Sequence, residues 1–333
     1  MAHPLALVSA RSKENNMAYS GNPKDYYVAV VYGGTSGERE VSLNSGKCCA
    51  QALESIGFKV KLIDPSLKDD LKALIDEPFD VAFLTLHGKG GEDGRIQGFL
   101  ETIGLPYTGS GILASAQAVN KAKAKEIYAA AGLNVAASAV IGKDDELDSQ
   151  DLYEIAEEVG IPCVVKPTTE GSSLGMTIVH SAENLREAID LALSVDDEAM
   201  VEAFIEGDEL TIGVLGNADP RALPIIQVVP TEDEFYNFHA KYAQGGSKHL
   251  CPAPVSPEVT EAVQELAVAA HSVLGCEGIS RSDIMVDAEG TCWVLETNTL
   301  PGMTVTSLVP DAARVAGIEF PQLCEKIIEL ALE

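Results

Sequence analysis

The chain has 333 residues, 46% of them hydrophobic, which is enough to bury a sizeable core and to form two or three domains. Its formal charge of −28 repels phosphate backbones and anionic lipid headgroups, so we expect neither nucleic acid nor membrane as a partner. Any anionic ligand must therefore meet a local cluster of cations or backbone amides that overcomes the overall field.

The cysteines and the N-terminus bear on where the protein works. The 7 cysteines are scattered, without a C-x-x-C pair or a histidine at zinc-finger spacing, which indicates a reducing cytoplasm. No apolar run is long enough for a membrane helix, and the short run at residues 5–8 lacks the basic start of a signal peptide. Residues 1–24, rich in Ser, Asn, Lys and Gly, are expected to form a disordered leader.

Strands and helices alternate from about residue 26. The apolar strand Tyr27–Val31 leads into the glycine-rich turn 33–37, and Ser42 is placed to cap the next helix, which should end at Gly57. Further strands are expected at Lys59–Ile63 and Val81–Leu86. This alternation predicts an N-terminal α/β domain with a parallel sheet and helices on its faces.

The turn Gly109–Ala114 fits the loose dinucleotide fingerprint G-x-G-x-x-[GA], which would favour an NAD-linked oxidoreductase. That fingerprint also needs a second strand ending in an acidic residue about twenty residues later. A lysine-rich helix, Lys121–Ala131, occupies that stretch instead. We therefore interpret the turn as the start of a helix and keep the oxidoreductase as an alternative.

The segment Lys166–Met176 is a loop of small residues between two apolar strands, which predicts a hairpin-like flap. Small residues let backbone N–H groups approach phosphate oxygens, and Lys166 adds positive charge. An ordinary flexible hairpin explains the pattern equally well. No P-loop motif occurs anywhere in the sequence.

A second hairpin, near the C-terminus, carries a candidate metal site. Alternation places Arg281 with Asp283 on one face of the first strand, and Glu296 with Asn298 on one face of the second. A register that sets Arg281 across from Glu296 brings all four together. Two carboxylates and an amide oxygen are donors that Mg²⁺ takes together with water and phosphate. A solvated polar face is the alternative, which we rank lower because apolar residues flank each polar one.

Two further candidates follow strands of the expected parallel sheet, at the edge where open sheets bind ligands. They are Glu38, after the first strand, and His87 in the segment H-G-K-G-G-E-D-G. A lone histidine is more often a hydrogen-bonded structural residue, but its place in a loop makes a functional role equally plausible.

Five motifs occur along the chain: Gly33–Ser42, His87–Gly94, Lys166–Met176, Lys241-Tyr242 and Glu296–Met303. Together, and in this order, they closely resemble the motifs of the D-alanine–D-alanine ligases of the ATP-grasp superfamily. The resemblance runs from about Val28 to the C-terminus.

The resemblance implies an α/β fold with α+β elements and a three-domain ATP-grasp architecture. The expected domains are an N-terminal substrate domain (25–109), a central ATP-grasp subdomain (110–204) and a C-terminal catalytic domain (205–333). In the implied reaction, one D-alanine carboxylate attacks the γ-phosphate of ATP, and the amine of a second D-alanine attacks the acyl phosphate. The dipeptide serves peptidoglycan synthesis. Two Mg²⁺ ions, or Mn²⁺ in their place, and a homodimer are also implied.

The same resemblance assigns roles at the nucleotide. ATP would be bound by Lys121, Lys166, Ser172, Ser173, Glu202, Phe204, Glu209 and Lys241, with Glu202 and Glu209 at the adenine and ribose. The metal ions would be held by Asp283, Glu296 and Asn298. The lysines would supply the positive charge that the acidic surface withholds.

Roles at the amino acids follow from the resemblance in the same way. Glu38 would bind the ammonium of the first D-alanine, with His87 near its carboxylate, and Ser307 would receive the carboxylate of the second. Arg281 and the backbone N–H of Gly302 would stabilise the oxyanion. A hydrogen-bond triad of Glu38, Ser172 and Tyr242 would tie the closing loop over the intermediate.

Tyr242 also bears on the second substrate. Related depsipeptide-forming ligases replace this tyrosine, so its presence favours D-alanine over D-lactate. A ligase for D-serine or D-lactate is the nearest alternative, because a methyl-scale difference is discriminated by only about 1–3 kcal/mol. A catalytically silent nucleotide-binding homologue would lack a metal ligand or Arg281, and this chain has them all.

Overall fold

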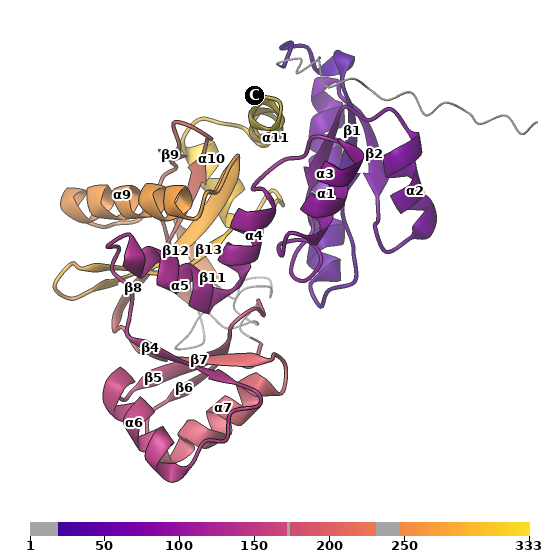
Figure 1. Cartoon of the computed structure of the whole chain (residues 1–333). Helices are drawn as coiled ribbons and strands as arrows, with labels where there is room; N and C mark the ends of the chain where they lie inside the picture. Colours follow the sequence, from indigo (N-terminus) through magenta and orange to yellow (C-terminus); the bar gives the residue numbers. More distant parts are fainter. Residues whose placement is uncertain (1–18, 172–173, 231–246) are drawn as a thin grey trace, which may run out of the picture.

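A computed structural model describes residues 19–171, 174–230 and 247–333, and these residues form three sheets with helices packed on them (Figure 1). Each sheet lies in one of the three segments that the sequence assigns to separate domains. The N-terminal and C-terminal sheets lie next to each other, and the central sheet stands apart from both at the bottom of the view. The mixed α/β class and the N-terminal parallel sheet are as predicted.

The N-terminal sheet is parallel, with its first strand in the middle. Its elements in chain order are η1 (Pro23–Asp25), β1 (Tyr27–Val31), α1 (Arg39–Ile56), β2 (Lys59–Ile63), α2 (Lys68–Asp76), β3 (Val81–Leu84) and α3 (Arg95–Ile103). β1 pairs with β2 on one side and β3 on the other. All three carboxyl ends therefore meet at one edge, where the loop 33–37 and the loop that begins at His87 both lie.

Ser42 does not cap a helix, contrary to the prediction. α1 already begins at Arg39, with Glu38 as its N-cap residue, so Ser42 lies within the helix and is buried. Its Oγ accepts a hydrogen bond from the Gly33 N–H at 2.8 Å and donates one to the Thr85 carbonyl at 2.8 Å. The hydroxyl thus satisfies backbone groups of two neighbouring loops. Gly57 does end α1, with φ of 110°.

The leader expected over residues 1–24 is folded from Tyr19 onward, and residues 1–18 lie outside the described part of the chain. The Tyr19 ring lies 5.1 Å from the ring of Tyr26 and 6.4 Å from that of Phe58. Its hydroxyl donates to Glu325 of the C-terminal helix α11 (Phe320–Ala331). The polar composition hid this aromatic contact, which fixes the segment.

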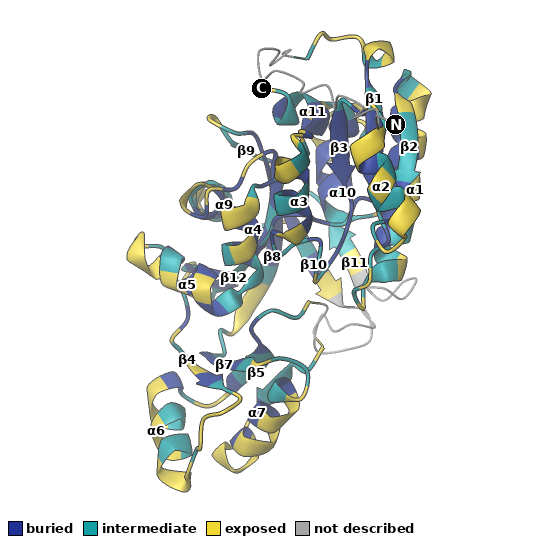
Figure 2. Ribbon diagram, turned by 45° about the vertical axis from the view of Figure 1, so that its right-hand side comes forward, coloured by how far each residue is buried: buried dark blue, intermediate teal, exposed yellow. Residues whose placement is uncertain are grey.

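The central sheet is antiparallel, with strand order β4-β7-β5-β6. Its elements are β4 (Ser138–Gly142), α6 (Ser149–Val159), β5 (Cys163–Pro167), β6 (Thr177–Val179), η2 (Ala182–Asn184), α7 (Leu185–Leu193) and β7 (Glu198–Ala203). β5 and β6 form the expected hairpin, with Cys163 opposite Val179. α6 and α7 lie on one side of the sheet, and much of their outer surface is exposed (Figure 2).

Two helices expected in the central domain pack on the C-terminal sheet instead. They are α4 (Ile112–Val119) and α5 (Lys121–Ala130). Ala118 and Tyr128 are buried in one apolar cluster with Val294 of the C-terminal sheet. The apolar faces of both helices thus lie against that sheet, and the boundary expected at residue 110 divides one packed unit.

The C-terminal sheet is antiparallel, with order β11-β10-β8-β12-β13 and β9 paired to β8. Its elements are β8 (Gly207–Leu215), β9 (Arg221–Ala222), β10 (Ile226–Pro230), β11 (Ser247–Leu250), α9 (Pro257–Val273), β12 (Ile279–Asp287), β13 (Cys292–Asn298), α10 (Leu308–Val315) and α11. Leu323 of α11 belongs to a cluster that contains Val28 and Leu53 of the N-terminal domain and Ile226 of this sheet. The two domains therefore share a hydrophobic core.

Candidate functional site

A cleft of about 440 Å³ lies between the central sheet and the C-terminal sheet. Seven of the residues predicted for nucleotide or metal binding line it: Lys121, Lys166, Glu202, Phe204, Glu209, Asp283 and Glu296. Phe204 directly follows β7, and Glu209 is the third residue of β8. The sequence therefore identified both walls of the cleft.

A buried trio of charges joins the central sheet to α5: Glu202 and Lys166 of the sheet and Lys125 of the helix. Glu202 is 2% exposed, and its carboxylate accepts hydrogen bonds from Lys166 (2.6 Å) and from Lys125. Burial opposes the charge on Glu202, but the two lysines lower its pKa. Burial likewise opposes the charge on Lys166, yet Glu202 beside it raises its pKa. Burial lowers the pKa of Lys125, which does not line the cleft, so Lys166 is the member of the trio that presents a positive charge to a bound phosphate.

Lys121, at the start of α5, joins the flap to the opposite wall. Its Nζ donates to the Glu170 carbonyl at 2.9 Å and lies 3.4 Å from Oε2 of Glu296. Glu170 in turn pairs with Lys89 of the N-terminal domain, Nζ to Oε1 at 3.0 Å. Polar contacts beside the cleft thus link the N-terminal domain (Lys89), the flap (Glu170) and the C-terminal side (Lys121 and Glu296).

The C-terminal wall is the hairpin of β12 and β13, and its register differs from the one considered from sequence. Arg281 lies opposite Asn298, and Asp283 lies opposite Glu296, with an irregularity between Asp283 and Ile284. Directly opposed residues of an antiparallel pair share a face, so the four side chains still meet. Arg281 Nη2 lies 2.9 Å from Asp283 Oδ2 and 3.7 Å from Glu296 Oε1.

These donors suit a hard divalent cation. Asp283 and Glu296 offer carboxylates, and Asn298 offers an amide oxygen that also accepts a hydrogen bond from the Leu300 N–H at 2.9 Å. In the described ranges, no cluster of three His, Cys, Asp or Glu side chains could hold a metal ion. Water and phosphate oxygens would therefore complete the coordination, as is usual for Mg²⁺.

Glu38 reaches the flap from the N-terminal domain. A Cβ built on Gly171 would lie 3.1 Å from Glu38 Oε2, and one on Gly88 would lie 3.0 Å from the same atom. The Glu38 carboxylate therefore lies between the flap and the loop after β3. Glycine at both positions leaves room for it.

His87 and Glu92 lie in that same loop. His87 is buried, with Nε2 3.3 Å from Ser45 Oγ, and burial lowers its pKa, so the ring is neutral at pH 7. Burial, together with the nearby Glu38 charge, raises the pKa of Glu92 to about 8. Its Oε2 accepts a hydrogen bond from the Gly88 N–H at 2.6 Å. An ionisable carboxyl thus stands next to the predicted substrate residues.

Gly302 and Ser307 are neighbours in space. A Cβ built on Gly302 would lie 3.1 Å from Ser307 Oγ. Ser307 is the N-cap residue of α10, and its Oγ accepts a hydrogen bond from the Thr304 N–H at 3.0 Å. A helix N-terminus favours a carboxylate, which suits the role expected of Ser307.

Four predicted residues lie outside the described part of the chain: Ser172, Ser173, Lys241 and Tyr242. Other residues at the site escaped the sequence analysis. Lys125 carried the clearest signal, because it follows Lys121 by four residues and so shares its helix face. Glu92 lies within the motif His87–Gly94, but the motif assigned no role to it, because its pairing depends on the fold.

Comparison with known proteins identifies the family. A family model described as D-ala D-ala ligase C-terminus matches residues 127–329, and one described as D-ala D-ala ligase N-terminus matches residues 65–110. A D-alanine–D-alanine ligase of Pelotomaculum thermopropionicum is 46% identical over 309 residues, which are 92% of this chain and 96% of that protein. The chain belongs to the D-alanine–D-alanine ligase family.

Solved structures of D-alanine–D-alanine ligases have the same ATP-grasp fold. The Bacillus anthracis enzyme complexed with ATP superposes with a TM-score of 0.80 at 31% identity, covering 92% of this chain and 97% of that one. The VanG D-Ala:D-Ser ligase of Enterococcus faecalis superposes with a TM-score of 0.79 at 29% identity. The match covers 92% of this chain and 99% of that one.

Membership in the D-alanine–D-alanine ligase family overturns the oxidoreductase alternative. The turn Gly109–Ala114 begins α4, with Gly111 as the N-cap residue, as we interpreted it from sequence. Gly109 packs closely against Gly278, where an added Cβ on Gly278 would lie 3.2 Å from the Gly109 nitrogen. Among residues 19–171, 174–230 and 247–333, no helix is long and apolar enough to cross a membrane.

Proposed function

We propose that the protein joins two D-alanines into D-alanyl-D-alanine, with conversion of ATP to ADP and phosphate. One arrangement carries the proposal: Lys121 and Lys166 line a single cleft together with Asp283 and Glu296. The family names of the relatives support the same reaction.

The first step is phosphoryl transfer in this cleft. Lys121 and Lys166 bind the phosphates of ATP, while Phe204 and Glu209 lie where the nucleoside is held. Asp283, Glu296 and Asn298 would hold two Mg²⁺ ions, or Mn²⁺, which neutralise charge on the β- and γ-phosphates. A carboxylate oxygen of the first D-alanine forms a bond to the γ-phosphorus. The bond from that phosphorus to the bridging oxygen breaks, and ADP leaves.

The second step forms the peptide bond. The amine of the second D-alanine attacks the acyl carbon, and Arg281 and the Gly302 N–H stabilise the oxyanion. The bond to the phosphate oxygen then breaks, and the nitrogen loses its proton. Glu38 pairs with the ammonium of the first D-alanine near His87, and Ser307 binds the carboxylate of the second.

Four residues outside the described ranges complete the proposal. Ser172, Ser173 and Lys241 would contact ATP, and Tyr242 would join Glu38 and Ser172 in the triad over the intermediate. Tyr242 is also proposed to favour D-alanine over D-lactate as the second substrate.

Product analysis tests the proposed function directly. The protein is mixed with Mg-ATP and D-alanine, and in parallel with L-alanine, or with D-alanine plus D-serine or D-lactate. We expect D-alanyl-D-alanine with one phosphate per dipeptide and no product from L-alanine. A mixed product formed in preference to D-alanyl-D-alanine would change the second substrate, and phosphate release without any dipeptide would refute the ligase.

Assembly and location are proposed on the family resemblance and the cysteine pattern. We expect a homodimer in the cytoplasm. Analytical ultracentrifugation of the purified chain measures the oligomeric state, and fractionation of the source cells measures the location.

A further inference from the structure

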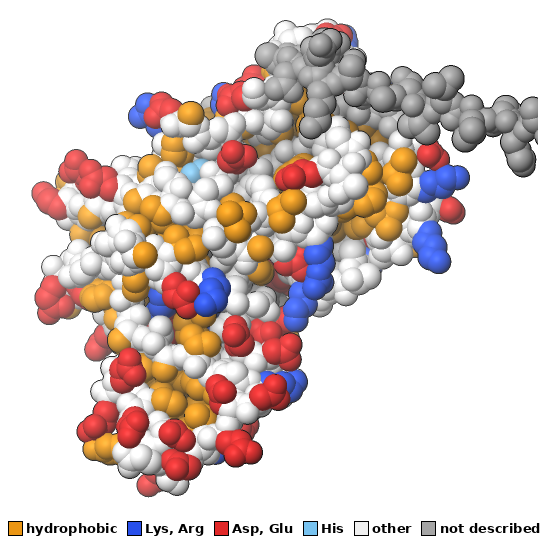
Figure 3. All heavy atoms as spheres, in the orientation of Figure 1, with side chains coloured by type: hydrophobic (Ala, Val, Ile, Leu, Met, Phe, Trp, Pro, Cys, Tyr) orange, Lys and Arg blue, Asp and Glu red, His pale blue; other side chains and the backbone are white. Residues whose placement is uncertain are grey.

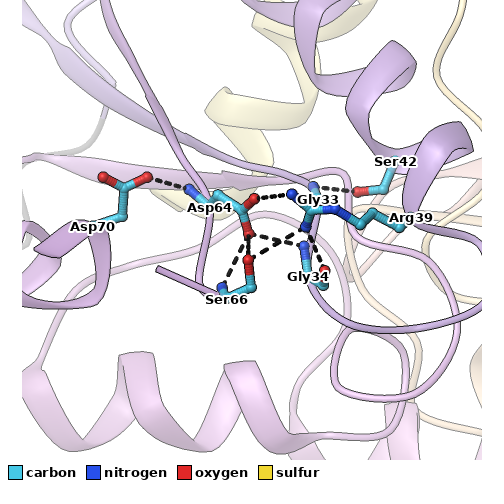
Figure 4. Close-up of polar contacts among 7 residues, drawn as sticks. All are labelled: Gly33, Gly34, Arg39, Ser42, Asp64, Ser66 and Asp70. Carbon is cyan, nitrogen blue, oxygen red and sulfur yellow. Dashed lines mark hydrogen bonds and ion pairs between the residues drawn. The ribbon is translucent and has the colours of Figure 1, made fainter. Parts of the chain in front are cut away.

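The carboxylate of Asp64, which follows the neighbouring strand, helps to hold the loop 33–37 between β1 and α1, together with Arg39 and Ser42 (Figure 4). Asp64 follows β2 directly and is 4% exposed. Its Oδ1 accepts hydrogen bonds from the Gly34 N–H at 3.1 Å and from the Ser66 N–H and Oγ at 3.0 and 2.7 Å. Its Oδ2 accepts one from Arg39 Nη2 at 2.6 Å. We call Asp64, Arg39, Ser66 and Gly34 the Asp64 network.

The charge on Asp64 is stabilised by these donors. Burial opposes ionisation, but hydrogen bonds from Arg39, Ser66 and Gly34 lower the pKa of Asp64 to about 2. Arg39 closes the network, because its Nη1 also donates to the Gly34 carbonyl. Both backbone groups of Gly34 are therefore fixed by charged side chains.

The glycine at position 33 lets the loop approach the Asp64 and Arg39 side chains closely. A Cβ built there would lie 2.7 Å from Asp64 Oδ2 and 2.9 Å from Arg39 Nη1, and φ is +78°. On its other side the loop borders a cavity of about 130 Å³, lined by Gly33, Gly34, Ser36, Ser66 and His87 among others. The loop thus borders open space on this side, and hydrogen bonds, together with the Leu86 side chain close to Gly34, fix its course.

The loop ends at Glu38, the residue next to Arg39. The Glu38 N–H donates to Ser36 Oγ at 3.2 Å, and Ser36 Oγ donates to the His87 carbonyl at 2.6 Å. The Asp64 network therefore fixes the start of the loop and the first residue of α1, and Glu38 lies between these two fixed points. No contact of Asp64 with the cleft is involved, since Asp64 is not among its lining residues.

From this geometry we infer that Asp64, acting through Arg39 and Gly34, is a positioning residue that aims the Glu38 carboxylate at the first amino-acid subsite. The inference rests on the role proposed for Glu38. It predicts a selective effect: loss of the network weakens binding of the first D-alanine and leaves binding of ATP and of the second D-alanine largely unchanged.

The test is the KM of each D-alanine subsite, from velocity measured over a wide D-alanine range at saturating Mg-ATP. Asp64→Asn keeps the shape and removes the charge. We expect the KM of the first subsite to rise roughly tenfold, which is typical for loss of a charged hydrogen-bond acceptor. The KM values for the second subsite and for ATP should stay within about twofold of the unsubstituted protein.

Two further variants keep the inference testable if Asp64→Asn folds poorly. Ser66→Ala removes one donor from an exposed residue and should raise the first-subsite KM about threefold. Arg39→Ala should raise it as Asp64→Asn does, and added guanidinium should restore it in part, because the Arg39 side chain is 38% exposed.

The matched control is Asp287→Asn. Asp287 accepts hydrogen bonds from the Trp293 indole and two backbone N–H groups in the β12–β13 turn, away from Glu38. The Asp287→Asn substitution should lower the melting temperature without changing the KM of either D-alanine subsite. An unchanged first-subsite KM in Asp64→Asn or Ser66→Ala, or an equal rise in all three KM values, overturns the inference. Failure of the unsubstituted protein to make dipeptide would instead refute the proposed function.

Discussion

The central sheet and the rest of the molecule are joined in different ways. The N-terminal and C-terminal domains share one hydrophobic cluster, in which Val28 and Leu53 pack with Leu323 and Ile226. We call these two domains, with α4 and α5, the body. The central lobe, residues 138–203, has a separate core that includes Val165 and Ile189. It meets the body at the cleft through ion pairs and hydrogen bonds such as those of Lys121, Lys89 and Glu170.

This difference indicates which parts of the molecule can move apart at a small cost in free energy. Separating the two parts of the body would expose apolar surface at roughly 25 cal/mol per Å². Separating the lobe from the body at the flap breaks exposed polar contacts such as the pair between Lys89 and Glu170, and exposed pairs stabilise by only about 0–1 kcal/mol each. The buried pair between Lys125 of α5 and Glu202 of β7 also joins the two parts. A cleft whose walls belong to two such units can open for nucleotide exchange and close for catalysis.

The largest expected effect is a loss of ATP turnover with little change in melting temperature. Glu296 stands on the body wall of the cleft, and Glu296→Gln should reduce ATP turnover roughly a thousandfold by removing a metal-binding charge. The melting temperature should change little, because Glu296 belongs to no hydrophobic cluster. Glu289→Gln, in the exposed turn of the same hairpin, is the control. Normal turnover in Glu296→Gln would remove the metal assignment.

Core substitutions test whether the body and the central lobe unfold as separate units. Leu323→Ala in α11 and Ile189→Ala in α7 each remove a fully buried side chain and should destabilise by about 2–5 kcal/mol. Calorimetry should show that Leu323→Ala lowers the transition of the body and Ile189→Ala that of the lobe. The exposed Leu191→Ala should leave both transitions in place. A single transition that both core variants shift equally contradicts the division.

Acid should weaken the body through His271. This histidine of α9 is buried, with Nδ1 2.8 Å from Ser280 Oγ, and burial lowers its pKa from 6.5 to about 4. The unfolded chain binds the proton first, so the stabilisation is complete above pH 6.5 and is lost as pH falls towards 4. The loss reaches at most about 3 kcal/mol.

Urea unfolding at pH 7 and pH 4.5 measures this dependence on pH. His271→Gln provides the comparison, because glutamine can keep a hydrogen bond to Ser280 and does not titrate. The variant should lose less stability between the two pH values than the unsubstituted protein does. An equal loss in both would mean that other groups account for the acid effect.

The smallest effect concerns the pair between Lys89 and Glu170. The two side chains are 50% and 26% exposed, so the pair should be worth about 0.2–1 kcal/mol. Lys89→Ala should therefore lower kcat/KM less than about fivefold, and raising the salt concentration should shrink the difference. Lys143→Ala removes a similar exposed pair with Asp197 inside the lobe and should have no effect. A difference that persists in high salt would point to a contact other than the ion pair.

The sequence predicted most of what depends on local pattern. Alternation of strand and helix gave the parallel N-terminal sheet, and small residues after Lys166 indicated the hairpin flap. Motif order identified the family. The sequence analysis also named both cleft-lining lysines and four of the acids there, Glu202, Glu209, Asp283 and Glu296, through the resemblance to the family motifs, but not Glu170, Glu206 or Asp208.

The rest depended on contacts between distant segments. The register of β12 and β13 includes an irregularity after Asp283 that alternation does not reveal. Ser42 resembled a helix cap, but the Gly33 and Thr85 backbone groups that it satisfies meet it only in the folded sheet. The expected central domain included α4 and α5, but an apolar helix face does not specify which sheet it will cover, and these two pack on the C-terminal sheet. Asp64 carried no motif at all.

The shared core of the body has a consequence for how the chain is made. α1 leaves the ribosome long before α11, whose Leu323, Cys324 and Ile327 cover part of the apolar face of α1. That part of the face stays uncovered while nearly everything between the two helices is translated. A nascent chain with such an uncovered helix is a natural client for a ribosome-associated chaperone.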